Sequence, residues 1–188
     1  ASRLKDQLAS AGTADEARNR AVVVLEEVSP ELRDKIMEAL AWGKHVNDHR
    51  DAWEIVRRAD HPSVGLILDS FHTLGRGVDP ETIRRIPGDK IFFVQLADAP
   101  LIQMDLLYWS RHFRNMPGEG DLDVAGFTRA VLATGYAGPL SLEVFNDQFR
   151  GGNPRLVAAD GRRSLLYLMD RLKREDPSLA PALAGVPD

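Results

Sequence analysis

Asp69, Gln95 and Glu143 each end a short apolar run of the sequence. If these runs are parallel strands, their carboxyl ends meet at one edge of a sheet, and the three side chains point into one small volume. Glu38, which precedes another expected turn between a strand and a helix, could be a fourth member. Carboxylate and amide oxygens suit Mg²⁺, Mn²⁺ or Co²⁺ better than copper or a structural zinc. These residues therefore predict a divalent-metal site, whereas each of them taken singly could simply cap a loop or helix.

His72 follows Asp69 by three residues, which places its imidazole at the same edge of the sheet. A histidine with a pKa near ~6.5 can exchange a proton at neutral pH, and the alternative role is a capping or packed histidine. Arg111 and Arg114 lie in a connection, 98–120, that is far longer than the roughly 2–6 residues of an ordinary loop in an α/β unit. Long connections are often binding loops, so these arginines could hold an anionic substrate; otherwise they form a solvated surface.

The elements that must position these residues are visible as alternating patterns. The apolar runs 64–69, 91–95 and 140–143 are bounded by proline or glycine and are expected to be strands. Residues 51–58 and 124–134 carry apolar side chains at intervals of three and four, which predicts amphipathic helices. Strands that alternate with helices are typical of a parallel sheet in an α/β fold.

Further signals mark where these helices begin and end. Asp121 or Asp123 can cap the start of the helix over 124–134, and Gly135 can close it in a left-handed conformation. A last helix is expected over 163–173, where the leucines repeat at helical spacing. The prolines of residues 174–188 predict a loose tail.

The whole chain, residues 1–188, is expected to be one domain in which residues 38–173 form the βα units. Residues 1–37 do not follow this pattern. Their last part, residues 30–37, has apolar positions at helical spacing, so we expect a helical N-terminal segment.

Composition excludes several classes of protein. The chain has 24 Lys and Arg against 28 Asp and Glu, and it has no basic block, which argues against binding to nucleic acid or to an anionic membrane surface. It has no cysteine, which excludes disulfides, thiolate zinc sites, iron–sulfur clusters and a cysteine nucleophile. Its apolar runs are much shorter than the ~20 residues of a membrane span, and its start does not resemble a signal peptide. We therefore expect a cytoplasmic protein.

Two stretches of the sequence resemble the C-terminal third of the xylose-isomerase-like TIM barrels, the sugar phosphate isomerase/epimerase superfamily: PGEGDLD at 117–123 and GYAGPLSLE at 135–143. Shorter motifs are similar to those of the bacterial 3-dehydroshikimate dehydratases of this superfamily: EALAWG at 38–43, LDSFH at 68–72, FVQLADA at 93–99 and LEVFND at 142–147. The resemblance implies an α/β fold of the TIM (β/α)8 type. Since such a barrel needs about 250 residues, we expect it to be N-terminally incomplete in this chain.

The resemblance also implies an activity, that of a lyase that dehydrates 3-dehydroshikimate to protocatechuate in the breakdown of quinate and shikimate. A divalent metal would bind the substrate's ketone oxygen and stabilise the negative charge formed when the neighbouring carbon loses a proton. The ligands implied by the matching motifs are Glu38, Asp69, Gln95 and Glu143.

Other residues take their roles from the same resemblance. His72 would be the general base, and then the acid that helps the hydroxyl group leave. Ser110 and Arg114, in the long connection, would hold the carboxylate of the substrate. If the barrel is incomplete, its exposed sheet edges should pair, so we also expect a homo-oligomer.

Two alternatives remain at this point. The chain could be a different isomerase or epimerase of the superfamily, acting on a sugar or polyol; a neutral substrate would not need Ser110 and Arg114 to face the metal. It could also be an inactive barrel remnant that acts only through protein contacts. Binding of a divalent metal would separate this last alternative from the two enzymes.

Overall fold

The computed structural model describes residues 35–183 of the chain. Helices alternate with strands in it, as the sequence patterns predict. The elements are β1 (Lys35–Glu38), α3 (His49–Ala59), β2 (Val64–Asp69), α4 (Ser70–Leu74), the 3-10 turns η1 (Pro80–Arg85) and η2 (Gly88–Lys90), β3 (Ile91–Leu96), α5 (Leu106–His112), α6 (Val124–Leu132), β4 (Leu140–Leu142), α7 (Asp147–Arg150), α8 (Pro154–Glu175) and the 3-10 turn η3 (Pro177–Leu179).

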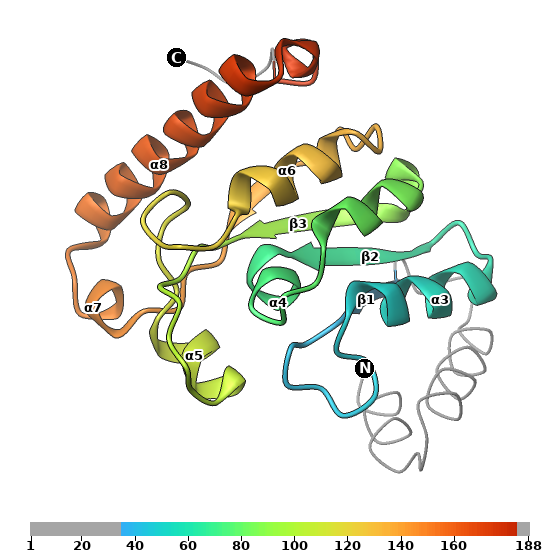
Figure 1. Ribbon diagram of the computed structural model, residues 1–188, viewed down its shortest axis with the longest axis horizontal. Coiled ribbons are helices and arrows are strands. Elements are labelled where there is room, and N and C mark those ends of the chain that lie inside the picture. The colour runs from blue at the N-terminus through green and yellow to red at the C-terminus, as the bar shows by residue number, and fades with distance from the viewer. Residues whose placement is uncertain (1–34, 184–188) are drawn as a thin grey trace.

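The strands form one parallel sheet in the order β1-β2-β3-β4. The three strands expected from the apolar runs are present, and β2 has the expected bounds. Because all strands run in the same direction, their carboxyl ends meet at one edge. Figure 1 shows α4, α5 and α7 at this edge, while α3 and α6 lie along the sheet. The residues that follow each strand are therefore brought close together.

Side-chain alternation divides each strand between two faces of the sheet. In β2, Leu66 and Leu68 are fully buried in the core that the strands share with the helices. Because successive side chains of a strand point to opposite faces, Asp69 lies on the other face. In β3 the same alternation separates Val94, a core residue, from Gln95. Asp69 and Gln95 thus lie on the face of the sheet opposite to this core.

Helices α3 and α6 confirm the two predicted amphipathic segments. Each is capped by an aspartate: Asp48 accepts a hydrogen bond from the backbone N–H of Arg50 (2.8 Å), and Asp123 accepts one from that of Gly126 (2.9 Å). Of the two cap candidates for α6, Asp123 is the one used. Gly135 follows this helix with a φ of 84°, a left-handed conformation that glycine adopts without strain.

Strand β1 corrects the sequence prediction for the last residues of the N-terminal segment. Residues 35–37 were expected to be helical, but residues 35–38 are a strand in parallel register with β2, with Glu38 opposite Ile67. Hydrogen bonds to a neighbouring strand thus override local helical spacing. The remaining residues of the expected helical segment, 1–34, lie outside the part of the chain that the structure describes.

The C-terminal region also differs from its prediction. The last helix is longer than expected, since α8 already begins at Pro154, with Asn153 as its cap. The predicted loose tail is wrong as far as residue 183, because Leu179 and Leu183 are buried in the main core. Residues 184–188 lie outside the described part.

The long connection after β3 is organised by one buried carboxylate. Asp98 Oδ1 accepts hydrogen bonds from the backbone N–H groups of Ala99 (2.8 Å) and Leu122 (2.9 Å), and its Oδ2 accepts one from Gly118 (3.0 Å). A Cβ at Gly120 would lie 2.4 Å from Asp98 Oδ1, so a side chain does not fit there. Asp98 thus fixes both ends of the segment that carries α5.

Replacing Asp98 with asparagine is expected to destabilise the chain by about 2 kcal/mol, because an amide N–H₂ cannot accept the hydrogen bond that one carboxylate oxygen now accepts. The unfolding midpoint in urea measures this loss. Asp105, which caps α5 through the backbone N–H of Tyr108 (2.9 Å), provides the control, since asparagine is an equally good cap. Equal midpoints for Asp98→Asn and Asp105→Asn would contradict the role of Asp98.

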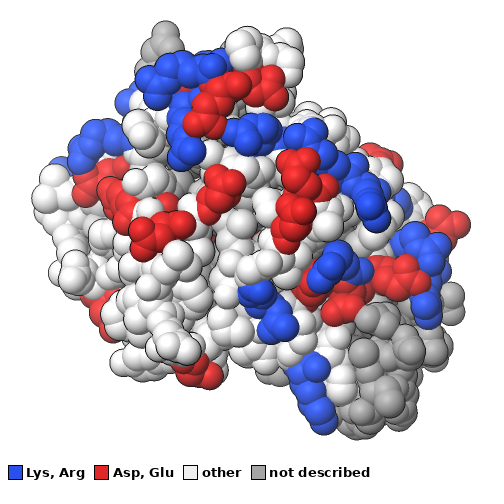
Figure 2. All heavy atoms as spheres, in the orientation of Figure 1, with Lys and Arg blue, Asp and Glu red and all other residues white. Residues whose placement is uncertain are grey.

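The outer surfaces of the helices are charged and internally paired. On α3, Glu54 contacts both Arg57 (2.9 Å) and Arg58 (2.6 Å), and α8 carries an ion pair between Arg171 and Glu175 (2.7 Å). Figure 2 shows acidic and basic side chains next to one another over the upper and right-hand parts of the view, while its lower left is largely uncharged. No helix within residues 35–183 combines the length and the apolar character needed to cross a membrane.

Candidate active site

The structure brings the four predicted metal ligands to the carboxyl edge of the sheet. Glu38 and Asp69 are the last residues of β1 and β2, Gln95 is the last but one of β3, and Glu143 directly follows β4. Asp69 and Gln95 are partners in the strand register. Gln95 Nε2 donates a hydrogen bond to Glu143 Oε1 at 2.7 Å. The strand ends thus gather these four side chains, as the sequence predicts; their role as ligands remains a prediction.

Asp69 is the most firmly held of the four. Its Oδ1 accepts hydrogen bonds from the backbone N–H groups of Phe71 (2.7 Å) and His72 (3.3 Å), so it caps α4. Its side chain is 0% exposed. Because Oδ1 is used by the cap, Oδ2 is the oxygen left to face the centre of the site.

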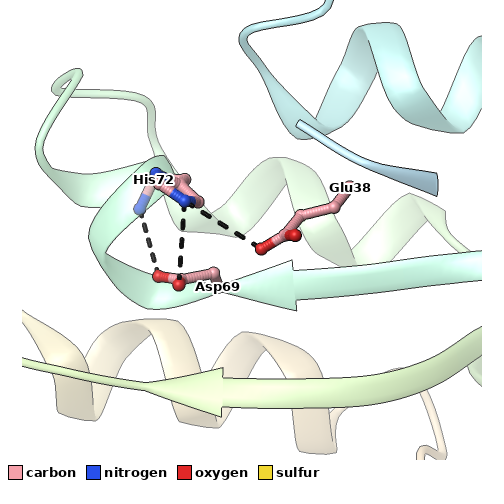
Figure 3. Close-up of side chains that lie close together, drawn as sticks. All are labelled: Glu38, Asp69 and His72. Carbon is pink, nitrogen blue, oxygen red and sulfur yellow. Dashed lines mark hydrogen bonds and ion pairs between the residues drawn. The ribbon is translucent and has the colours of Figure 1, made fainter. Parts of the chain in front are cut away.

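Glu38, Asp69 and His72 form a group that could hold a metal ion: one ligand atom of each lies within 4.8 Å of the others. His72 Nε2 is 3.9 Å from Glu38 Oε1 and 3.9 Å from Asp69 Oδ2. Figure 3 shows the three side chains pointing toward one another from β1, β2 and α4. This triad differs from the predicted set, which excludes His72 and includes Gln95 and Glu143.

The burial of several carboxylates close together marks this edge as a place for a cation. Burial, followed by the charges of Asp69 and Glu143, raises the pKa of Glu38 to about 7. Burial and the neighbouring charge of Asp69 also raise the pKa of Glu143. A group of carboxylates that resists full ionisation gains most from a divalent cation, which neutralises the charges that the protein holds together.

One unpaired atom supports the same conclusion. The Oε1 atom of Gln95 is buried and has no hydrogen-bond partner among the residues described. A buried carbonyl oxygen without a partner is costly, and such an atom in a polar site commonly faces a bound ligand. The amide is oriented by its Nε2–H bond to Glu143, which leaves the lone pairs of Oε1 able to coordinate a metal ion. The residues present therefore fit a hard divalent ion.

The raised pKa of Glu38 predicts how pH affects stability. Glu38 holds its proton more tightly in the folded chain than in the unfolded chain, so its contribution is fully present below about pH 4.5 and is lost as the pH rises through about 7. Glu38→Gln cannot ionise and escapes this loss. In the presence of a chelator, we expect Glu38→Gln to melt about 3 °C or more above the wild type at pH 8, with little difference at pH 4.5. A constant difference between the two pH values would contradict the raised pKa.

His72 is buried and neutral. Desolvation, with smaller effects of the nearby Arg114 and Arg111, lowers its pKa to about 4 despite the opposing charge of Asp69. Its Nδ1 accepts a long hydrogen bond (3.3 Å) from the backbone N–H of Ala41, which favours the proton on Nε2, whereas Arg114 Nη2, a donor 3.4 Å from Nε2, favours a lone pair there. Because this bond is long, the preference is worth only about 1 kcal/mol, and the form with a free lone pair at Nε2 is accessible.

Arg114 lies closer to the carboxylates than the sequence suggests. Its Nη1 donates to Asp69 Oδ2 at 2.7 Å and is 3.2 Å from Glu143 Oε2. Its Nη2 donates to the hydroxyl of Ser110 at 2.8 Å. The structure therefore pairs Ser110 with Arg114, the two residues expected to bind a substrate carboxylate, while the guanidinium contacts two of the expected metal ligands.

Aromatic residues that the sequence did not assign to the site surround these groups. Phe71 and Phe145 lie against the Arg114 guanidinium, with their ring centroids 4.7 and 5.3 Å from its central carbon. Trp42 packs edge-on against His72, with ring centroids 5.0 Å apart. Exposed Arg111 lies over Trp42 (5.8 Å) and Phe145 (5.1 Å). These aromatic residues lie within the same short motifs as the ligands, and this position is the signal that could have identified them.

Comparison with known proteins agrees with the geometry. The family described as "Xylose isomerase-like TIM barrel" matches residues 5–168. Two curated proteins named 3-dehydroshikimate dehydratase are 59% identical: one from Pseudomonas putida over 154 residues (80% of this chain) and one from Pseudomonas aeruginosa over 147 residues (76%). The matched regions span only 24% and 23% of those proteins. A solved "xylose isomerase-like TIM barrel/4-hydroxyphenylpyruvate dioxygenase fusion protein" superposes with a TM-score of 0.79 at 55% identity, covering 87% of this chain and 26% of that one.

Proposed function

Because the chain belongs to the xylose isomerase-like TIM barrel family, we propose that it is a hydro-lyase that converts 3-dehydroshikimate to protocatechuate in the cytoplasm. The relatives named 3-dehydroshikimate dehydratase are about four times longer than the matched region. Their name therefore supports the proposal only in combination with the geometry of the site. The observation that carries the proposal is the buried Gln95 Oε1, which has no hydrogen-bond partner within residues 35–183 and lies at the sheet edge shared with three carboxylates.

The residues that would hold the metal are Glu38, Asp69, Gln95 and Glu143. All four offer oxygen, which favours Mg²⁺, Mn²⁺ or Co²⁺. When bound, such an ion supplies a Lewis acid that polarises the substrate's ketone and stabilises negative charge on its oxygen. The protein contributes the fixed orientation of the donors, since the cap of α4 holds Asp69 and the amide of Gln95 holds Glu143.

His72 is the residue proposed to move protons. Its Nε2 faces the carboxylate edge, and its low pKa keeps it neutral at pH 7, so that it can accept a proton from the carbon beside the ketone. The protonated ring can then return this proton to the departing hydroxyl group, which leaves as water. A proton then moves from a ring carbon to the ketone oxygen, which completes the aromatic ring of protocatechuate. The aromatic stabilisation makes the reaction favourable.

Ser110 and Arg114 are proposed to hold the substrate's carboxylate. They lie side by side, and a hydroxyl next to a guanidinium is a suitable pair of donors for an anion. The ring of Phe71 lies against the guanidinium, with its centroid 4.7 Å from the central carbon. A neutral sugar or polyol offers no negative charge for the buried guanidinium to bind, which favours an acidic substrate over those of the sugar isomerases.

The open sheet edges support a further part of the proposal, a homo-oligomer. Within residues 35–183, β1 and β4 each have a strand neighbour on one side only. Unpaired strand edges tend to find a partner, so we propose that a second copy covers them. Light scattering after size exclusion should give twice the mass of the chain or more; a well-folded monomer would contradict this part.

The function itself is tested by incubating the 188-residue chain with 3-dehydroshikimate and Mn²⁺ and following the ultraviolet absorbance of protocatechuate. We expect product formation that a chelator abolishes and that Glu143→Gln reduces to background. A chain that binds Mn²⁺ but forms no product would instead be a remnant without this activity. Product formation that survives the chelator would contradict the role of the metal.

A further inference from the structure

Arg114 fills the position between carboxylates where a cation is expected. Its Nη1 bridges Asp69 Oδ2 (2.7 Å) and Glu143 Oε2 (3.2 Å), and the side chain is only 1% exposed. The Oδ1 atom of Asp69 is occupied by the cap of α4, so Oδ2 is the atom that a metal would need. In this structure Arg114 donates a hydrogen bond to that same oxygen.

Side chains within residues 35–183 already occupy every nitrogen of the guanidinium. Its Nε and Nη2 both donate to Ser110 Oγ (3.2 and 2.8 Å), and Nη2 also lies 3.4 Å from His72 Nε2. Its Nη1 is used by Asp69 and Glu143. A substrate carboxylate can therefore bind Arg114 only after one of these bonds has been broken.

We propose that Arg114 is an internal counter-ion that a divalent metal displaces from Asp69 and Glu143, and that this displacement frees Nη1 to bind the carboxylate of the substrate. The inference rests on the proposed function and adds an order of binding, with the metal first and the acid second. Arg114 influences metal binding through Asp69 and Glu143, without contacting the metal itself.

Charge and geometry give the exchange its direction. A divalent ion attracts the carboxylates about twice as strongly as a guanidinium at the same distance, and it repels a cation that remains on the same oxygen. Ser110 supplies a pivot, because its bonds to Nε and Nη2 do not involve the metal ligands. A small rotation about this pivot would turn Nη1 away from Asp69. By thermodynamic linkage, metal and carboxylate ligand then strengthen each other's binding.

Calorimetric titration with Mn²⁺ alone tests the first half of the exchange. Arg114→Gln removes the competing charge, so it should bind Mn²⁺ about tenfold more tightly than the wild type, or better. Arg114→Lys keeps the charge and should stay closer to the wild type. Arg57→Gln, on the exposed surface of α3, is the matched control and should change nothing. Affinity of Arg114→Gln that is equal to or weaker than that of the wild type would overturn the proposal.

The second half is tested with benzoate, a planar carboxylate without a reacting ketone. The wild type should bind benzoate about tenfold more tightly with Mn²⁺ than with a chelator, and Arg114→Gln with Mn²⁺ should lose this gain. Equal binding with and without Mn²⁺ in the wild type would refute the exchange even if Arg114→Gln does not fold. If the wild type and the Arg114 variants bind Mn²⁺ with equal affinity, the exchange is refuted, but the proposed function stands. Absence of Mn²⁺ binding to every protein would overturn both.

Discussion

Replacing His72 with glutamine is expected to reduce the turnover of 3-dehydroshikimate by about 10²–10⁴-fold while leaving Mn²⁺ binding in place. The amide retains much of the size and polarity of the imidazole but cannot accept a proton. His72 is the residue proposed for this transfer because its Nε2 faces both Glu38 and Asp69 at 3.9 Å. The initial rate of protocatechuate formation at saturating substrate measures the effect.

A second histidine provides the control for this variant. His61 is exposed and its Nδ1 accepts a hydrogen bond from the backbone of Ser63, so His61→Gln should keep full activity. Turnover of His72→Gln within tenfold of the wild type would contradict the role of general base. Loss of Mn²⁺ binding in His72→Gln would instead place His72 among the ligands, as the triad with Glu38 and Asp69 allows.

Asp69→Ala is expected to abolish Mn²⁺ binding and to destabilise the chain by about 3–5 kcal/mol even in the presence of a chelator. The stability loss has two causes. The carboxylate caps α4, and it is the buried partner of Arg114, whose charge would be left without its shortest ion pair. Unfolding in urea with a chelator measures the stability, and calorimetry measures Mn²⁺ binding.

Asp69→Asn separates these causes. Asparagine retains an oxygen for the cap of α4 but carries no charge, so it should lose Mn²⁺ affinity strongly and stability less than Asp69→Ala does. Asp69→Ala that unfolds at the wild-type midpoint would contradict the structural role. If Mn²⁺ raises the unfolding midpoint of Asp69→Ala as much as that of the wild type, the role of Asp69 as a ligand is contradicted.

The layout of the site followed from the sequence because parallel strands impose it. Once 64–69 and 91–95 are accepted as parallel strands of one sheet, both end at the same edge, and alternation points Asp69 and Gln95 away from the core residues beside them. The motif that contains Glu143 supplied the next position. These are local patterns, a few residues long, whose consequences do not depend on the rest of the chain.

What the sequence missed depends on contacts between distant residues. Strand β1 exists because residues 35–38 pair with β2, and no local spacing reports such pairing. The prolines of the C-terminal segment predicted a loose tail, but Leu179 and Leu183 are buried in the core. The bond between Arg114 and Asp69 joins residues 45 positions apart, so it could not be read from spacing.

Glu38, Asp69, Gln95 and Glu143 are proposed to hold one divalent ion together. The most direct test is anomalous X-ray diffraction from crystals of the chain grown with Mn²⁺. We expect one manganese peak bonded to an oxygen of each of these four side chains, with Gln95 bound through Oε1. A peak bonded to His72 without Gln95, or no peak at this edge of the sheet, would contradict it.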